Sequence, residues 1–133
     1  MRDFGAYVRK LEAWSRGEEE ARNFVPNTYL IALCGTELVG RISIRHCLND
    51  FLEKVGGHIG YGVVPAYRRR GYGTQILEQG LGVARGIGLN RVLLTCDDDN
   101  EASYKIIEAN RGVLERVDRS PGQQGKRHYW IDL

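Results

Sequence analysis

The chain lacks any apolar run near the roughly 20 residues that a helix needs to span a bilayer. Its N-terminus also lacks the apolar core of a secretory signal. The three cysteines, Cys34, Cys47 and Cys96, lie far apart and form no Cys-x-x-Cys pair. Because this pattern favours reduced thiols over disulfides or a zinc site, we expect a soluble protein of the cytoplasm.

A strong excess of charge of either sign is absent as well. The formal net charge is +2 in 133 residues, and the basic residues are spread along the chain apart from Arg68–Arg70. This balance is too mild for a typical nucleic-acid-binding protein, so we expect neither nucleic acid nor a membrane as a partner. A chain of this length is expected to form one domain, residues 1–133, around a single core.

Residues 60–74 are the most informative segment of the sequence. A strand that ends at Pro65 is followed by a short basic loop, and glycines in that loop open a helical pattern. Such a loop presents backbone N–H groups at the positive end of a helix dipole, where a phosphate or pyrophosphate binds. Gly71 and Gly73 would let the main chain approach the anion without a Cβ in the way. The segment therefore predicts a phosphate-bearing cofactor.

Two common phosphate-binding loops are excluded by residues that their chemistry requires. No glycine is followed by Lys-Ser or Lys-Thr, as a Walker loop needs. A dinucleotide-binding loop needs a third small residue, and Pro65 and Ile76 occupy the two positions where it would stand. The remaining pattern is Arg-x-x-Gly-x-Gly, formed by Arg68, Gly71 and Gly73.

This pattern, together with the preceding strand end at Tyr61, Val63 and Pro65, resembles the coenzyme A loop of the GNAT superfamily of N-acetyltransferases. Other segments extend the resemblance over most of the chain, and they are similar to one bacterial branch known only as predicted acetyltransferases. These segments are residues 40–46, residues 57–61, the helix Thr74–Gly86, the strand Arg91–Cys96, the segment Asp99–Ser103 and residues 127–131.

Hydrophobic periodicity predicts the elements of the fold. We expect strands over Thr28–Leu33, Leu38–His46, His58–Val64, Arg91–Cys96, Val113–Arg119 and Lys126–Leu133, and helices over Met1–Gly17, Asp50–Val55 and Thr74–Gly86. A further helix should have Asp98 or Asp99 as its cap and an inward face of Ala102, Ile106 and Ala109. The pattern is that of an α+β protein. The resemblance implies a mixed, mostly antiparallel sheet flanked by helices, with the parallel strands His58–Val64 and Arg91–Cys96 splayed apart at its centre.

The resemblance also implies that acetyl-CoA is the acyl donor and that the splayed strands receive its pantetheine arm. On this interpretation the main chain of Tyr61, Gly62 and Val63 bonds the arm, and Asn100 bonds its far side. The pyrophosphate is held by the loop residues Arg68, Arg69, Arg70, Gly71, Tyr72, Gly73 and Thr74. Residues 97–100, Asp-Asp-Asp-Asn, lack the glycine and glutamate of a calcium loop, so we expect no metal.

The catalytic groups are less clear from the sequence. In the superfamily a tyrosine seven residues after the asparagine often protonates the leaving thiolate, and Ile107 occupies that position here. Tyr104 lies one turn earlier and could replace it, and His58 is a second candidate for a catalytic role. On this interpretation the family's first strand and helix are abbreviated, so the acceptor pocket is shallow, is completed in a homodimer, or has been lost.

Two functional hypotheses follow from these observations. The first is an acetyl-CoA-dependent N-acetyltransferase that acts by direct attack of a primary amine of a small molecule or a protein. The second is a binding module of the same fold that holds acyl-CoA and regulates a partner without turnover. The sequence identifies neither the amine nor the preferred acyl chain.

Overall fold

The computed structural model describes residues 6–11 and 25–133 of the chain. The elements follow in the order β1 (Ala6–Leu11), β2 (Asn27–Cys34), β3 (Glu37–Arg45), α1 (Asp50–Lys54), β4 (Ile59–Val63), the 3₁₀ helix η2 (Pro65–Tyr67), α2 (Tyr72–Ile87), β5 (Arg91–Asp97), α3 (Glu101–Ala109), β6 (Val113–Asp118) and β7 (Lys126–Asp132). None of the helices in these residues is long and apolar enough to cross a membrane.

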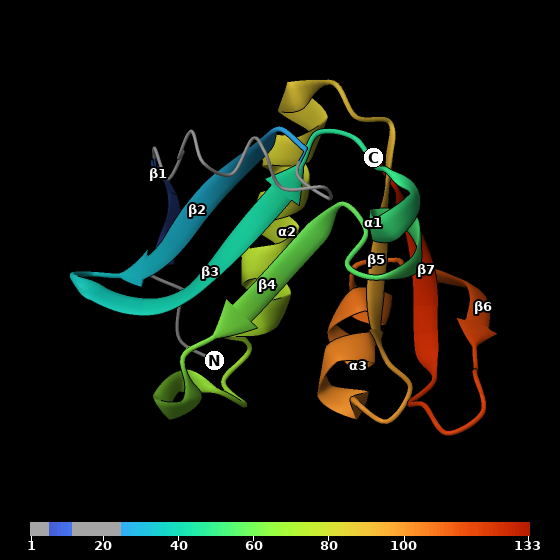
Figure 1. Ribbon diagram of the computed structural model, residues 1–133. Helices are drawn as coiled ribbons and strands as arrows, with labels where there is room; N and C mark the ends of the chain where they lie inside the picture. The colour runs from blue at the N-terminus through green and yellow to red at the C-terminus, as the bar shows by residue number, and fades with distance from the viewer. Residues whose placement is uncertain (1–5, 12–24) are drawn as a thin grey trace.

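The strands form two antiparallel sheets, with the orders β1-β2-β3-β4 and β5-β7-β6. Strands β4 and β5, which border the two sheets, run in the same direction, come together at one end and diverge toward the other (Figure 1). At the closed end the His58 N–H donates a hydrogen bond to the Leu93 carbonyl at 2.7 Å. The predicted α+β fold with splayed central strands is therefore confirmed.

The sequence pattern of the strands and of the turn between them was sufficient to predict the β2–β3 hairpin. Its turn contains Gly35, whose φ of 64° belongs to the left-handed region that favours glycine. The pairing of β3 with β4 runs without a register shift from Gly40 opposite Val63 to Ile44 opposite Ile59. Gly60 and Gly62 are therefore not part of a β-bulge against β3.

The helix predicted over Met1–Gly17 is wrong at residues 6–11, which form strand β1. This strand pairs antiparallel with β2, with Ala6 opposite Cys34 and Leu11 opposite Tyr29. Pairing with the edge of β2 satisfies the backbone groups on one side of β1, and this tertiary contact outweighs the helical spacing of its apolar residues. The chain therefore does contain a first strand, while the rest of that prediction lies outside the described residues.

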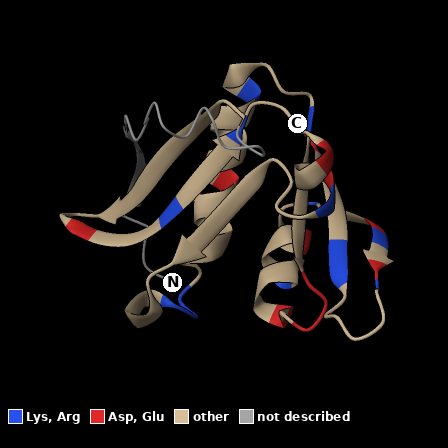
Figure 2. Cartoon of the chain, in the orientation of Figure 1, with Lys and Arg blue, Asp and Glu red and all other residues tan. Residues whose placement is uncertain are grey.

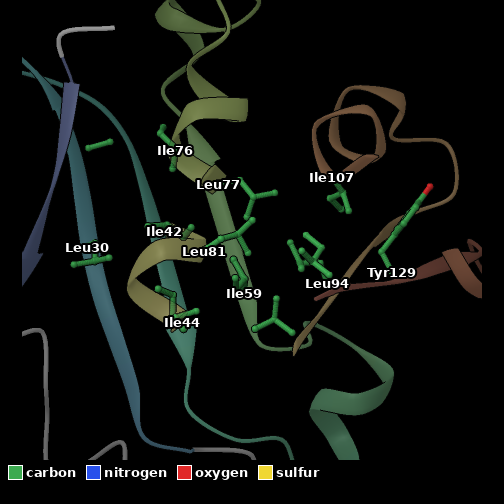
Figure 3. Packing of buried hydrophobic residues seen from close by; sticks show 14 of the residues in the cluster. Leu30, Ile42, Ile44, Ile59, Ile76, Leu77, Leu81, Leu94, Ile107 and Tyr129 are labelled. Atoms are coloured by element: carbon green, nitrogen blue, oxygen red, sulfur yellow. The ribbon is translucent and has the colours of Figure 1, made fainter. Parts of the chain in front are cut away.

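Helix α2 packs its apolar face against the inner face of the first sheet (Figure 3). Ile76 and Leu77 of the helix and Ile42 and Ile44 of β3 are completely buried. Burying each of these side chains is worth roughly 1.5–3 kcal/mol. A Cβ at Gly80 would overlap with Ile42 Cδ1, so the absence of a side chain there lets α2 approach β3 closely.

Helix α3 differs from its predicted phase and cap. Ile107 is the buried residue of this helix and points toward the core, whereas Ala102 and Ala109 are exposed (Figure 3). The N-cap is Asn100, whose Oδ1 accepts a hydrogen bond from the Ser103 N–H at 3.2 Å, and not Asp98 or Asp99. The helix is rotated because it packs through Ile107 onto the second sheet, which the local pattern could not specify.

Candidate functional site

A cavity of about 540 Å³ opens where β4 and α3 diverge. It is lined by Tyr61 and Val63 of β4, by Arg68, Arg69, Gly71, Gly73 and Thr74 of the basic loop and the start of α2, and by Asn100, Ala102, Ser103 and Ile106 at the start of α3. The structure thus brings eight of the eleven residues predicted to bind the cofactor to one cavity. Ala102, Ser103 and Ile106 were not predicted as site residues, although their helical spacing after Asn100 was a signal for a shared face.

The basic loop takes an unusual backbone path before α2. Arg69 has a φ of 65°, which is uncommon for a residue other than glycine, and Gly71 has a φ of 85°. Arg68 Nε donates to the Val63 carbonyl at 3.1 Å and so ties the loop to the end of β4. Gly71 is the N-cap of α2 and provides no side-chain cap. The first turn of α2 therefore directs its N–H groups and the positive end of its dipole toward the cavity.

Gly73 has a packing role in addition to its place in the cavity wall. It is buried, and a Cβ at this position would lie 2.6 Å from Ile106 Cδ1 of α3. The absence of a side chain thus allows the start of α2 to approach α3 closely.

Three predicted cofactor residues do not line this cavity. Arg70 lies over the ring of Tyr67, with its guanidinium carbon 5.7 Å from the ring centroid. Tyr72 is buried, and its hydroxyl donates to Cys34 Sγ at 3.6 Å. At Gly62, the position that a side chain would occupy faces Arg41 on the other face of the sheet.

The basic loop after β4 and the acidic turn after β5 both lie at the end where these two strands diverge (Figure 2). Asp98 accepts hydrogen bonds from Arg119 at 2.6 Å and from Arg127 at 2.7 Å. The Arg127 bond, supported by Arg119, holds the pKa of the Asp98 carboxyl below its usual value. The Asp98 carboxylate is thus neutralised within the second sheet, whereas Arg68 and Arg69 at the cavity form no ion pair in the described part of the chain.

The side chain of Tyr61 crosses from β4 to α3. Its hydroxyl lies 3.1 Å from Ser103 Oγ and donates to the Ser103 carbonyl at 3.2 Å. Burial, as the largest cause, raises the pKa of Tyr61 to about 12, so the phenol is uncharged at neutral pH. Tyr61 therefore places a neutral hydroxyl between the two walls of the cavity.

Neither Tyr104 nor Ile107 is among the residues that line the cavity. Ile107 is completely buried in the core. The guanidinium carbon of Arg127 lies 3.8 Å from the centroid of the Tyr104 ring, a cation–π contact. A catalytic role for Tyr104 stays a prediction, since the arrangement of these residues does not test it.

His58 lies where β4 and β5 meet rather than in the cavity lining. Its Nδ1 accepts a hydrogen bond from the Leu93 N–H at 2.9 Å, and its own backbone N–H donates to the Leu93 carbonyl. The ring is therefore neutral, with its proton on Nε2. Burial, followed by the charge of Arg45, lowers the pKa of His58 below its ordinary value. The visible role of His58 is to join the two sheets, and its catalytic role remains a prediction.

Replacing His58 with alanine is expected to lower the free energy of unfolding by about 1–3 kcal/mol, because the buried Leu93 N–H loses its acceptor. The pKa of His58 is lower in the native protein than in the unfolded chain. The stabilisation that the neutral ring gives is therefore present in full above the ordinary pKa near 6.5. It is lost as the pH falls through the lower native pKa. Urea denaturation between pH 8 and pH 5 should therefore give a smaller pH dependence for His58→Ala than for the wild type. Burial also lowers the pKa of His128, which is present in both proteins, so parallel profiles would contradict the assignment to His58.

The sequence pattern of the Acetyltransferase (GNAT) family matches residues 3–113. No curated protein matches the chain.

Solved structures with the same fold include RimL, a ribosomal L7/L12 α-N-protein acetyltransferase in complex with coenzyme A, at 19% identity and a TM-score of 0.65, over 80% of this chain and 62% of that one. The chain thus spans less than two thirds of the length of RimL. A second is yncA from Salmonella typhimurium, provisionally named an acetyltransferase, with its cofactor acetyl-CoA, at 16% identity and a TM-score of 0.65, over 80% and 64% of the two chains. A third, provisionally named a phosphinothricin N-acetyltransferase, has 14% identity and a TM-score of 0.71, over 96% of this chain and 98% of that one.

Proposed function

Because the chain belongs to the acetyltransferase (GNAT) family, we propose that it is an N-acetyltransferase that moves the acetyl group of acetyl-CoA to a primary amine. The observation that carries this proposal is the cavity between β4 and α3, with the N-terminus of α2 and two arginines at its open end. Unpaired cationic side chains and helix N–H groups suit a diphosphate. The three free cysteines are consistent with action in the cytoplasm.

In this proposal the residues from Arg69 to Thr74 hold the pyrophosphate, with Arg68 fixing the loop to β4. The main chain of Tyr61, Gly62 and Val63 follows the pantetheine arm, since the edge of β4 that faces the gap is not paired with β5. The carbonyl side of the Asn100 amide caps α3, and its NH₂ group stays able to donate to the arm.

Acetyl-CoA supplies an activated acyl group that an uncharged amine attacks directly. The chain must then hold the amine beside the cavity and keep water away, and it must stabilise negative charge on the carbonyl oxygen. The backbone N–H groups of β4 at the gap are suited to the last task. Tyr104 and His58 remain the proposed groups for proton transfer.

The alternative is a module that binds acyl-CoA without turnover. The specific observation in its favour is Ile107, a completely buried aliphatic residue where the family often has a proton-donating tyrosine. Both proposals require CoA binding, so binding alone does not separate them.

The test is a pair of measurements on the wild-type chain. Calorimetric titration with CoA and acetyl-CoA is expected to give one site per chain, and ATP is expected to bind much more weakly. Release of CoA thiol from acetyl-CoA in the presence of a panel of primary amines should then exceed the release without amine. Binding without amine-dependent release would favour the module, and absence of CoA binding would refute both.

A further inference from the structure

A second cavity, of about 340 Å³, lies beside the end of β4. It is lined by Tyr29 and Ile31 of β2, by Leu38, Gly40 and Arg41 of β3, and by Gly62, Val63, Val64 and Arg68. Val63 and Arg68 line both cavities. The second cavity is therefore separated from the first by little more than the backbone of β4.

Gly62 makes this separation thin. It pairs with Arg41 across the β3–β4 ladder, and a Cβ at Gly62 would lie 3.8–3.9 Å from the guanidinium of Arg41. The space above Gly62 is thus bordered by the Arg41 guanidinium instead of a β4 side chain. A group held by Arg41 would lie against the main chain that we propose to follow the pantetheine arm.

The charge of Arg41 is not neutralised by any residue that the structure describes. Arg41 is exposed, and it forms no ion pair or side-chain hydrogen bond in the described residues. Arg68, the other charged lining residue, uses its Nε to bond the Val63 carbonyl. None of the lining residues is acidic. The charge of this cavity is therefore positive, with a free guanidinium at one side and the apolar groups of Tyr29, Ile31 and Leu38 at another.

The guanidinium and the apolar residues of the second cavity determine which kind of ligand it can bind. A guanidinium binds a carboxylate through two parallel hydrogen bonds, with geometry that an ammonium ion cannot match. Positive charge nearby disfavours the protonated form of an amine, and the uncharged form is the one that attacks a thioester. A di- or polycationic amine would be repelled by the same charge. The apolar residues offer a surface for an aliphatic or aromatic side chain.

We propose that this second cavity is the acceptor site, and that the acceptor is an amino acid with an apolar side chain whose carboxylate binds Arg41. The inference rests on the proposed acetyl transfer and names its substrate class. The free carboxylate is the recognised group, so a peptide N-terminus or an amino acid amide is a poor substrate.

The first experiment compares matched substrates with the wild-type chain and saturating acetyl-CoA. Apolar L-amino acids such as L-leucine and L-phenylalanine are each paired with their carboxamide, and spermidine serves as the polycationic amine. The kcat/KM of the acids is expected to exceed that of their amides by about tenfold or more, the worth of a charge-assisted hydrogen bond. Equal or faster transfer to the amides, or a preference for spermidine, would overturn the inference while leaving acetyl transfer intact.

The second experiment changes the guanidinium. Arg41→Gln is expected to raise the KM for the amino acid by about tenfold or more, while the KM for acetyl-CoA and the rate with the amide change little. Arg41→Lys should recover only part of the loss, because lysine keeps the charge and loses the paired hydrogen bonds. The matched control is Arg85→Gln, at an exposed position in the last turn of α2, which should leave both KM values unchanged.

Failure of the proposed function gives a different pattern from failure of this inference. If wild-type chain binds no CoA, or releases no CoA thiol with any amine, acetyl transfer itself is refuted and the acceptor proposal falls with it. If Arg41→Gln raises the KM for acetyl-CoA and not for the amine, Arg41 serves the donor and the inference is overturned alone.

Discussion

Replacing Gly57 with alanine is expected to lower the free energy of unfolding by about 3 kcal/mol, through left-handed backbone strain and overpacking together. Gly57 has a φ of 61°, and a Cβ there would overlap with the backbone carbonyl of Leu93 in β5. The obstacle is main chain, so no side-chain rotation relieves it. Leu93 is also the partner of His58, and the two sheets meet at this point. Urea denaturation of the variant and the wild type measures the difference.

Gly35→Ala is the matched control for this prediction. Gly35 has a φ of 64°, almost the same as Gly57, and a Cβ there would meet nothing within 4 Å. In Gly35→Ala the free energy of unfolding should fall only by the cost of the left-handed conformation, about 1 kcal/mol. Equal losses in the two variants would mean that the contact with β5 has no energetic weight.

Gly71→Val is expected to weaken CoA binding by about a hundredfold or more, since several charge-assisted hydrogen bonds depend on this turn. The φ of 85° at Gly71 is strongly disfavoured for a β-branched residue. A valine would shift the start of α2 and move its N–H groups away from the cavity. Calorimetric titration of CoA into the variant measures the effect.

The control for this variant lies in the β6–β7 turn. Gly122 has a φ of 76° and open space around its Cβ position, so Gly122→Val carries similar backbone strain away from the cavity. Both variants should lose comparable stability, and only Gly71→Val should lose CoA affinity. Normal affinity in a folded Gly71→Val protein would remove the loop from the binding site.

Agreement between sequence and structure is best where the signal is local. The hairpin turn at Gly35, the strand β4 that ends shortly before Pro65 and the glycine-opened helix α2 depend on residues within a few positions of one another. The cavity gathers most of the predicted cofactor residues for the same reason, since one loop and one strand end supply them. Of the cavity residues at the start of α3, the sequence predicted only Asn100.

Prediction and structure disagree where the conformation of a segment depends on residues far away in the sequence. Residues 6–11 form a strand because β2 offers an unpaired edge, and nothing within the segment encodes that edge. Asn100 caps α3, whereas the carboxylate of Asp98, one of the two predicted caps, binds Arg119 and Arg127 instead. His58 faces the Leu93 backbone, a contact between residues 35 positions apart.

The amino-acid order by itself determined the glycine-opened turn before α2, the paired strands of the hairpin and the family, because each depends on backbone conformations that neighbouring residues impose. Only the tertiary structure decided which face of α3 is buried, that Tyr61 reaches Ser103, and that Arg41 lies beside Gly62 with no ion pair to any residue that the structure describes. Those features arise from contacts between segments far apart in the chain, where packing and charge outweigh local preference.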